Sequence, residues 1–190
     1  MLISHPHSRG KPTRAFTLLE LMLSVSLLGV MTAIAAPKFG AFIANTTIRA
    51  NANTLHTALF QARSHALSHQ TTVIVCAATD PKLEECEQNR QANKQWLHGL
   101  ILFADNNGNN RLDASDLLIR QLEISEQVRV VFNQRGRLRF FEDGHARSAG
   151  IYVCGENSKK EAYIRLLHTG RARISGKLNK KQRSRCLTSG

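Results

Sequence analysis

Residues 16–36 read FTLLELMLSVSLLGVMTAIAA, an apolar run with one charged side chain, Glu20. At about 1.5 Å per residue this run would form a helix of roughly 31 Å, the thickness of a bilayer core. Three cations, Arg9, Lys11 and Arg14, lie directly before it. The positive-inside bias holds such an N-terminus in the cytoplasm. The sequence therefore predicts one transmembrane helix, with everything after it outside the cytoplasm.

A cleaved secretory signal fits this run poorly, because such a signal has a shorter apolar region followed by a small-residue cleavage site. Glu20 is unusual within a membrane helix, where a carboxylate costs about 2.5–3.5 kcal/mol. One interpretation places it in the first turn, where it complements the positive end of the helix. The other requires a partner, a free amine created by cleavage just before Phe16.

The block RAFTLLELMLSVSLLGVMTAIAAPKF, residues 14–39, resembles the class III leader and N-terminal helix of type IV pilins and type II secretion pseudopilins. The resemblance implies that a prepilin peptidase removes the leader, residues 1–15, and methylates the new N-terminal Phe16. It also implies that Glu20 meets the N-terminal amine of a neighbouring subunit during assembly. The family usually has Gly before the cut, whereas this chain has Ala15. We expect cleavage there, at a lower rate.

Removal of the leader leaves 175 of the 190 residues and lowers the net charge from +12 to +9, because the leader holds three basic residues and no acidic one. Residues 37–70 predict an amphipathic continuation of the helix, whose apolar stripe packs under a globular domain. His56, His65 and His69 lie on this segment, but no acidic or thiol partner shares their spacing, so we expect no metal site there. The stripe consists of Phe42, Ile48, Ala52, Leu55, Leu59, Ala62 and Ala66.

The remaining segment, 71–190, changes to a β pattern. Short runs rich in Val, Ile, Leu and aromatic residues are separated by Gly, Asn and Asp turns. Because no long helical pattern interrupts them, we expect antiparallel strands and an α+β fold in which the N-terminal helix packs on a C-terminal antiparallel β-sheet domain. The runs are TTVIVCAA, LHGLILFA, DLLIRQLEI, QVRVVFN, RLRFF, GIYVC and AYIRLLH.

Cys76, Cys86, Cys154 and Cys186 form an even set in a segment predicted to reach an oxidising compartment, where disulfides persist. Of the three possible pairings we favour Cys76 with Cys86, which closes a charged loop, and Cys154 with Cys186, which fastens the basic C-terminal segment. Each would contribute roughly 3 kcal/mol of stability. The sequence has no Cys-x-x-Cys redox or zinc motif.

The two early cysteines are followed by WLHGLILFADNNGNNRLDASDLLIRQ (96–121), Cys154, and TGRAR (169–173) before Cys186. This order resembles the GspH/FimT branch of minor pilins and pseudopilins, whose members combine the pilin helix with a β-rich domain. The resemblance implies more for FimT-like members, which are associated with DNA uptake in natural transformation. A Gly-Arg-x-Arg motif in their C-terminal part is linked to DNA binding. Here it is Gly170, Arg171, Ala172 and Arg173.

The C-terminal segment 169–186 carries seven Lys or Arg and no acidic residue. If 170–175 is extended, Arg171 and Arg173 point to one face, and Gly170 leaves room for a phosphate backbone. Guanidinium forks suit phosphate oxygens, so binding would be sequence-independent. The alternative is a solvated basic end. The predicted DNA-binding residues are Gly170, Arg171, Arg173, Lys177, Lys180, Lys181, Arg183 and Arg185.

The stretch DNNGNNRLDASD, residues 105–116, places oxygen-bearing side chains at positions 1, 3, 5, 9 and 12 of a calcium-binding loop. Position 6 is Asn110 where Gly is preferred, and the preceding residues predict a strand and not a helix. Asn can adopt the left-handed conformation, so calcium is an alternative, but we favour an Asn-rich hairpin turn without metal. The candidate ligands are Asp105, Asn107, Asn109, Asp113 and Asp116.

No nucleophile, base and orienting acid share a recognisable motif, so we expect neither enzymatic activity nor a cofactor. The expected partners are DNA, other pilins and minor pilins, the prepilin peptidase and the inner membrane. We expect a single-pass protein of the bacterial inner membrane with a periplasmic domain, which moves to the pilus filament or cell surface on assembly. The alternative is a structural subunit without DNA binding, either a minor pilin or a GspH-like pseudopilin of type II secretion, which primes or caps the filament.

Overall fold

The computed structural model describes residues 16–87, 95–96, 98–134, 137–155, 161–175, 178 and 180–187. The chain divides into two compact units, Met1–Gly40 and Ala41–Gly190. One helix, α1 (Leu18–His69), passes through both. Its first turn is capped by Thr17, whose Oγ1 accepts a hydrogen bond from the backbone N–H of Glu20 at 3.3 Å.

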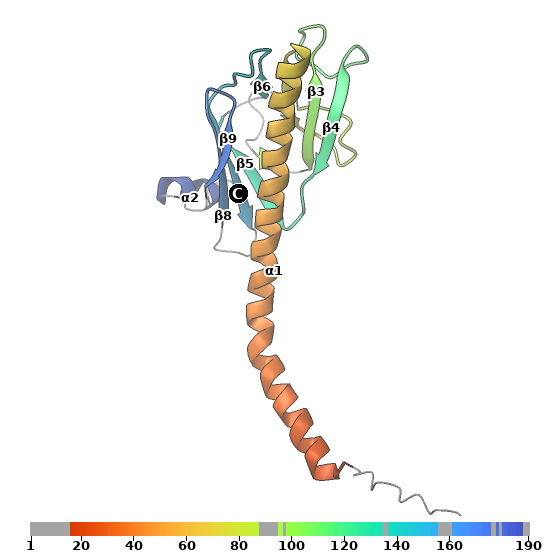
Figure 1. The fold of residues 1–190 in the computed structure, drawn as a ribbon, viewed down its shortest axis with the longest axis vertical. Coiled ribbons are helices and arrows are strands. Elements are labelled where there is room, and N and C mark those ends of the chain that lie inside the picture. The colour runs from red at the N-terminus through yellow and green to blue at the C-terminus, as the bar shows by residue number, and fades with distance from the viewer. Residues whose placement is uncertain are drawn as a thin grey trace, which may run out of the picture. The chain divides into compact units, whose positions relative to one another are not determined.

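The second half of α1 packs on the β-sheets through the stripe that its sequence predicts (Figure 1). The stripe begins at Ile48 and ends at Ala66, and Ala58 also belongs to it. The prediction for Phe42 is wrong, because this side chain is 62% exposed. Ile48 is the first residue of α1 in the buried core, so the helical period is correct but the buried part of the stripe is shorter.

In the part of the chain that the structure describes, the β-strands form two sheets, in which all pairings are antiparallel as predicted. The four-stranded sheet has the order β4-β3-β1-β6, and the five-stranded sheet has the order β2-β5-β7-β8-β9. The strands are β1 (Val73–Ala77), β2 (Gln95–Trp96), β3 (Gly99–Ala104), β4 (Leu117–Glu123), β5 (Val128–Phe132), β6 (Leu138–Phe140), β7 (Ala149–Gly155), β8 (Glu161–Leu166) and β9 (Ala172–Ser175).

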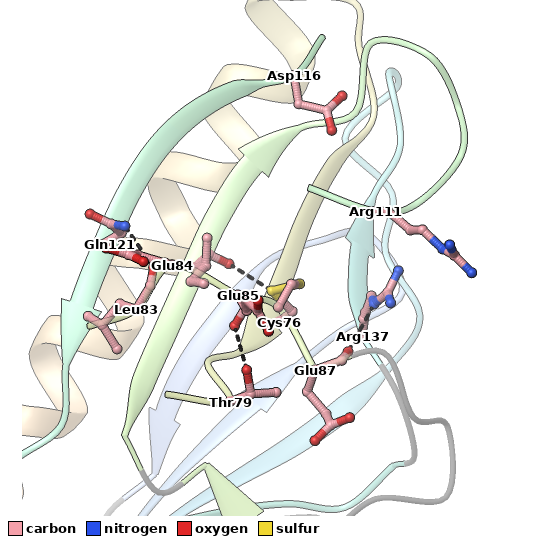
Figure 2. Close-up of a disulfide and its surroundings, with 12 residues drawn as sticks. Cys76, Thr79, Leu83, Glu84, Glu85, Glu87, Arg111, Asp116, Gln121 and Arg137 are labelled. Carbon is pink, nitrogen blue, oxygen red and sulfur yellow. Dashed lines mark hydrogen bonds between the residues drawn. A yellow bond between two sulfur atoms is a disulfide. The ribbon is translucent and has the colours of Figure 1, made fainter. Parts of the chain in front are cut away.

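The main core lies where both sheets meet α1. Alternate residues of the central strands enter it, for example Val75 from β1, Val153 from β7 and Ile164 from β8. The opposite face of the four-stranded sheet is also buried, because the loop closed by the Cys76–Cys86 disulfide packs on it. In Figure 2 this loop lies over β1 and β3, and Gln121 of β4 donates to the Leu83 carbonyl at 2.7 Å.

The opposite face of the five-stranded sheet carries a second helix, α2 (Lys180–Leu187). The sequence pattern did not predict it, because an eight-residue segment reading KKQRSRCL has no apolar stripe. The Cys154–Cys186 disulfide joins α2 to β7. Both disulfides are those favoured from the sequence.

Candidate nucleic-acid interface

Two arginines lie directly opposite each other on the β8–β9 hairpin. The register pairs Arg165 of β8 with Arg173 of β9, and both side chains are exposed. Strand alternation explains their direction, because the neighbouring Ile164 and Leu166 are buried in the core shared with α1. The pair therefore projects from the face of the sheet that points away from α1.

Helix α2 packs on this same face. Arg165 is opposite Gly150 of β7, and cross-strand partners share a face of the sheet. Cys154 lies four positions after Gly150 on the same strand, so its side chain is on that face as well. Cys154 is bonded to Cys186 of α2. Around this disulfide, Tyr152, Val131, Tyr163 and Leu178 form a small apolar cluster. In addition, the Arg129 side chain of β5 donates a hydrogen bond to the Cys186 carbonyl. A helix of basic composition is thus fixed on the face of the sheet that carries the arginine pair.

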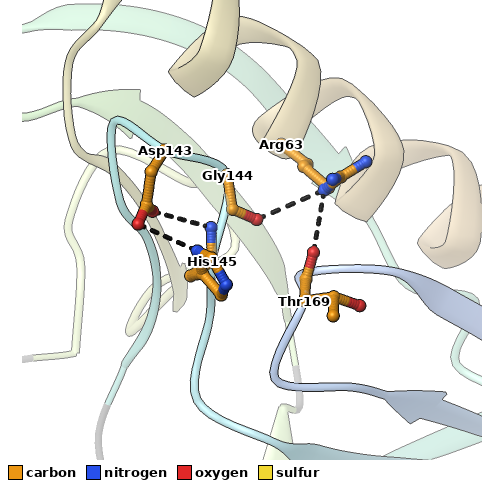
Figure 3. A network of polar contacts seen from close by, with 5 residues as sticks. All are labelled: Arg63, Asp143, Gly144, His145 and Thr169. Atoms are coloured by element: carbon orange, nitrogen blue, oxygen red, sulfur yellow. Dashed lines mark hydrogen bonds and ion pairs between the residues drawn. The ribbon is translucent and has the colours of Figure 1, made fainter.

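The turn between β8 and β9 is held against α1 by Arg63. Its Nε donates to the carbonyl oxygens of Gly144 at 3.2 Å and Thr169 at 3.1 Å (Figure 3). One residue later, Gly170 has φ of 72°, and its N–H donates to the Leu167 carbonyl at 2.9 Å. One arginine therefore fixes two neighbouring turns of the domain.

The proposed contact of Gly170 with phosphate is not supported by its position. Gly170 is buried, and a Cβ at this site would lie 2.0 Å from the Gly144 carbonyl oxygen and 3.0 Å from Arg63 Nε. Glycine is needed here for positive φ and for the close approach of the two turns. Its role is to set the geometry of the hairpin that carries Arg171 and Arg173.

His56 of α1 provides a second link between this helix and the β8–β9 hairpin. Its Nε2 lies 3.0 Å from the Ala172 carbonyl oxygen, at hydrogen-bonding distance. His65 and His69 stack on each other with ring centroids 4.0 Å apart. Among the residues that the structure describes, no three His, Cys, Asp or Glu side chains are grouped to hold a metal ion. We therefore interpret His56 as a residue that links α1 to β9, and not as a metal ligand.

The predicted cationic residues fall into three groups. Arg171 and Arg173 are exposed, as is Lys180 at the start of α2. Lys181, Arg183 and Arg185 belong to α2, but their side chains lie outside the described part of the structure, and Lys177 lies outside the described residues altogether.

Arg165 was not identified from the sequence as a candidate site residue. The signal for it was present, since pairing AYIRLL with RARIS across the HTG turn places Arg165 opposite Arg173.

The residues predicted for processing and assembly lie in the first unit. Ala15 and the rest of the leader lie outside the described residues. Phe16 is exposed, and Glu20 lies in the first turn of α1. Among the described residues, no helix is both long enough and apolar enough to cross a membrane. The transmembrane helix over 16–36 therefore stays a prediction.

Replacement of Gly170 by Ala tests its structural role. We expect the free energy of unfolding to fall by about 2–4 kcal/mol, because Ala at positive φ is strained and its Cβ would collide with the Gly144 carbonyl. Gly108 is the matched control, since its φ is 73° but no atom lies within 4 Å of its Cβ position. Urea unfolding of the full-length chain in detergent should show a loss of only about 1–2 kcal/mol for Gly108→Ala. Equal losses for the two variants would contradict the packing role.

The architecture defines a pilin-like class of protein, in which one N-terminal helix continues into an antiparallel β domain. Two crystal structures of the type IV minor pilin FimU from Pseudomonas aeruginosa share this fold. One matches with a TM-score of 0.53 at 17% identity, covering 76% of this chain and 98% of that chain. The other matches with a TM-score of 0.51 at 16% identity, covering 67% and 91%.

The minor pseudopilin EpsH from the type 2 secretion system of Vibrio cholerae is also similar, with a TM-score of 0.49 at 10% identity, covering 68% of this chain and 96% of that chain. Comparison with curated proteins gave no significant match. The model of the prokaryotic N-terminal methylation motif matches residues 10–36. The model of the type II transport protein GspH matches residues 51–170. The chain belongs to the GspH family, within the class of minor pilins and pseudopilins.

Proposed function

We propose that the chain is a minor pilin that binds extracellular DNA for uptake in natural transformation. The observation that carries the proposal is the exposed pair Arg165 and Arg173, beside the disulfide-bound helix α2. In this proposal the leader is cut after Ala15, Phe16 is methylated, and the 16–36 helix crosses the inner membrane before assembly. Glu20 then meets the neighbouring subunit. The chain performs no catalysis.

The arginine pair has an electrostatic reason to bind an anion. Directly opposite residues of an antiparallel pair have Cβ atoms about 4.5–5.5 Å apart, and like charges in such positions destabilise the strands. A phosphate placed against Arg165 and Arg173 would offset this repulsion and accept charge-assisted hydrogen bonds from both guanidinium groups. Among the described residues, neither guanidinium group has an acidic side chain within ion-pair distance. The pair is therefore available to a polyanion.

Binding should depend on the phosphate backbone and not on base sequence. Helix α2 has eight residues and is fixed to the sheet through Cys186, which is 5% exposed, so it is poorly suited to enter a DNA groove. The two tyrosines of this face are also unsuited to stacking on bases. Tyr152 is buried and stacks on Tyr163 with ring centroids 4.9 Å apart. Phosphate contacts are then the main source of affinity.

A structural subunit without DNA binding is the alternative, either a minor pilin or a pseudopilin of type II secretion. The matching family model describes a type II transport protein, and this favours the alternative. However, the matched range ends at Gly170, and Arg171, Arg173 and α2 follow it in the chain. The cationic face thus includes elements beyond the segment that matches the family, and a direct binding measurement distinguishes the two functions.

The test is a titration of labelled duplex DNA with the full-length chain in nonionic detergent, at several salt concentrations. We expect log Kd to rise linearly with log salt, with a slope of about 0.9 for each phosphate contact. Arg165→Gln should weaken binding several-fold and lower this slope by about 1. Arg49→Gln, which changes an exposed cation on α1, is the matched control and should leave the slope unchanged. Failure of the wild-type chain to bind DNA at low salt would leave the structural function.

A further inference from the structure

The loop between β3 and β4, residues 105–116, has oxygen-bearing side chains at the spacing of a calcium-binding loop. Its residues at positions 1, 3 and 5 each accept a backbone hydrogen bond through a side-chain oxygen. Asp105 Oδ2 accepts from Asn110 N at 3.0 Å, Asn107 Oδ1 accepts from Asn109 N at 3.0 Å, and Asn109 Oδ1 accepts from Arg111 N at 2.6 Å. Each of these bonds makes a local turn of the chain.

The departure at position 6 does not prevent this turn. Asn110 has φ of 61°, the left-handed conformation for which glycine is usually required. The strand before the loop is confirmed as β3, so the flanking helices of an EF-hand are absent from this part of the chain. A calcium loop depends on its own oxygen donors, and these donors are present between two strands as they would be between two helices.

An independent observation indicates that the loop has a ligand. Asp105 is only 6% exposed, and it is the one charged residue that is buried among the described residues. Its Oδ1 is buried and has no hydrogen-bond partner in the described part of the structure. The bond from Asn110 N to Oδ2 holds the other oxygen of this carboxylate against the loop. A buried carboxylate oxygen without a partner is costly, and a cation in the loop would compensate it.

The chemistry of the surrounding donors selects the ion. All the side chains at positions 1, 3, 5, 9 and 12 offer oxygen, and position 7 offers the backbone carbonyl of Arg111. Asp113 Oδ2 lies within the same cluster, accepting from the amide nitrogens of Asn107 at 3.0 Å and Asn109 at 2.6 Å. No three acidic, His or Cys side chains of the described chain are grouped for a metal. A site built on amide and carbonyl oxygens suits Ca²⁺ better than Zn²⁺.

We propose that residues 105–116 bind one Ca²⁺ ion, with the buried Asp105 carboxylate as its central ligand. Asn107 and Asn109 contribute their amide oxygens, Arg111 its backbone carbonyl, and Asp113 a carboxylate oxygen. Asp116 closes the loop instead, because its two carboxylate oxygens accept hydrogen bonds from Asn106 N and Asp113 N, each at 3.0 Å. The ion joins the end of β3 to the start of β4 and fixes the loop between them. This inference is independent of DNA binding, because the loop connects strands of the four-stranded sheet whereas the arginine pair lies on the five-stranded sheet.

Isothermal titration of the EDTA-treated, dialysed full-length chain with CaCl₂ tests the proposal. We expect saturable binding of one ion with Kd of about 0.1–1 mM, the range of extracellular calcium modules. Saturating CaCl₂ should raise the thermal midpoint by several degrees. MgCl₂ at the same concentrations should have little effect, because Mg²⁺ requires near-ideal octahedral geometry.

Two variants locate the site. Asp105→Asn should weaken calcium binding at least tenfold and, without calcium, should be at least as stable as the wild type, because it removes a buried unpaired charge. Asn109→Ala, which truncates an exposed side chain, should also weaken binding about tenfold. Glu126→Gln, at an exposed position outside the loop, should bind as the wild type does. The proposal is overturned if the wild type shows no saturable binding up to about 10 mM, or if both loop variants bind calcium with wild-type affinity.

Discussion

A chain with both Arg171 and Arg173 replaced by Gln should bind duplex DNA at least about tenfold more weakly than the wild type. Both side chains are exposed, one at the end of the β8–β9 turn and the other in β9. Loss of two phosphate contacts should also lower the salt slope by about 1.8. Glutamine keeps much of the length and polarity of the side chain, so the change acts through charge and the guanidinium fork. Fluorescence anisotropy with the full-length chain measures both quantities.

The control is the double variant Arg49→Gln, Arg111→Gln. It removes the same charge from two exposed positions outside the five-stranded sheet. If charge acts only at long range, the two double variants will weaken binding equally, and the assignment to Arg171 and Arg173 fails. If these two residues contact phosphate, only the variant that lacks them changes the slope. In the bacterium that carries the gene, the variant with Gln at positions 171 and 173 should strongly lower transformation frequency while pilus assembly continues.

The sequence predicted the parts of the fold that depend on local periodicity. The helical stripe from Ile48 to Ala66 and the alternation of the strands both follow from burying one face of an element. Phe42 was misassigned because the same period continues beyond the point where the sheets contact the helix. Periodicity states which face is apolar, but only the tertiary structure determines how much of that face is covered.

The candidate site was predicted only in part, because it depends on pairing and not on composition. Arg171 and Arg173 were identified from a motif, whereas Arg165 enters the site only through the register of β8 with β9. Gly170 was selected from the motif for a close approach of phosphate. Its actual constraint comes from the turn at Gly144, 26 positions earlier in the chain. Such a contact has no sequence signal that could be read from one chain.

Helix α2 was missed for a related reason. Lys, Gln and Arg are good helix formers, but an isolated helix of this length is marginal in water. What holds α2 is the bond from Cys186 to Cys154 and the apolar cluster with Tyr163 and Leu178. The disulfide pairing was predicted from the sequence, and its consequence for the local structure was not. The stability of α2 therefore depends on that crosslink.

Replacement of Cys154 and Cys186 by Ser should consequently affect both stability and DNA binding. The pair spans 32 positions, so its loss should lower the free energy of unfolding by about 4 kcal/mol in the loop-entropy model. Release of α2 from the sheet should also separate its cations from Arg165 and Arg173, and the affinity for DNA should fall several-fold. The affinity is measured under conditions where circular dichroism shows that the domain is folded.

The second disulfide supplies the matched control for this prediction. Cys76 and Cys86 are 10 positions apart, so Ser at both should cost about 3 kcal/mol, nearly as much as the first double variant. Their loop packs on the four-stranded sheet, away from β9 and α2. DNA affinity should therefore stay at the wild-type value in this variant. If both double variants lose affinity in proportion to stability, DNA binding reflects general integrity of the fold. If only the Cys154–Cys186 variant loses it, the disulfide contributes to binding by holding α2 beside the arginine pair.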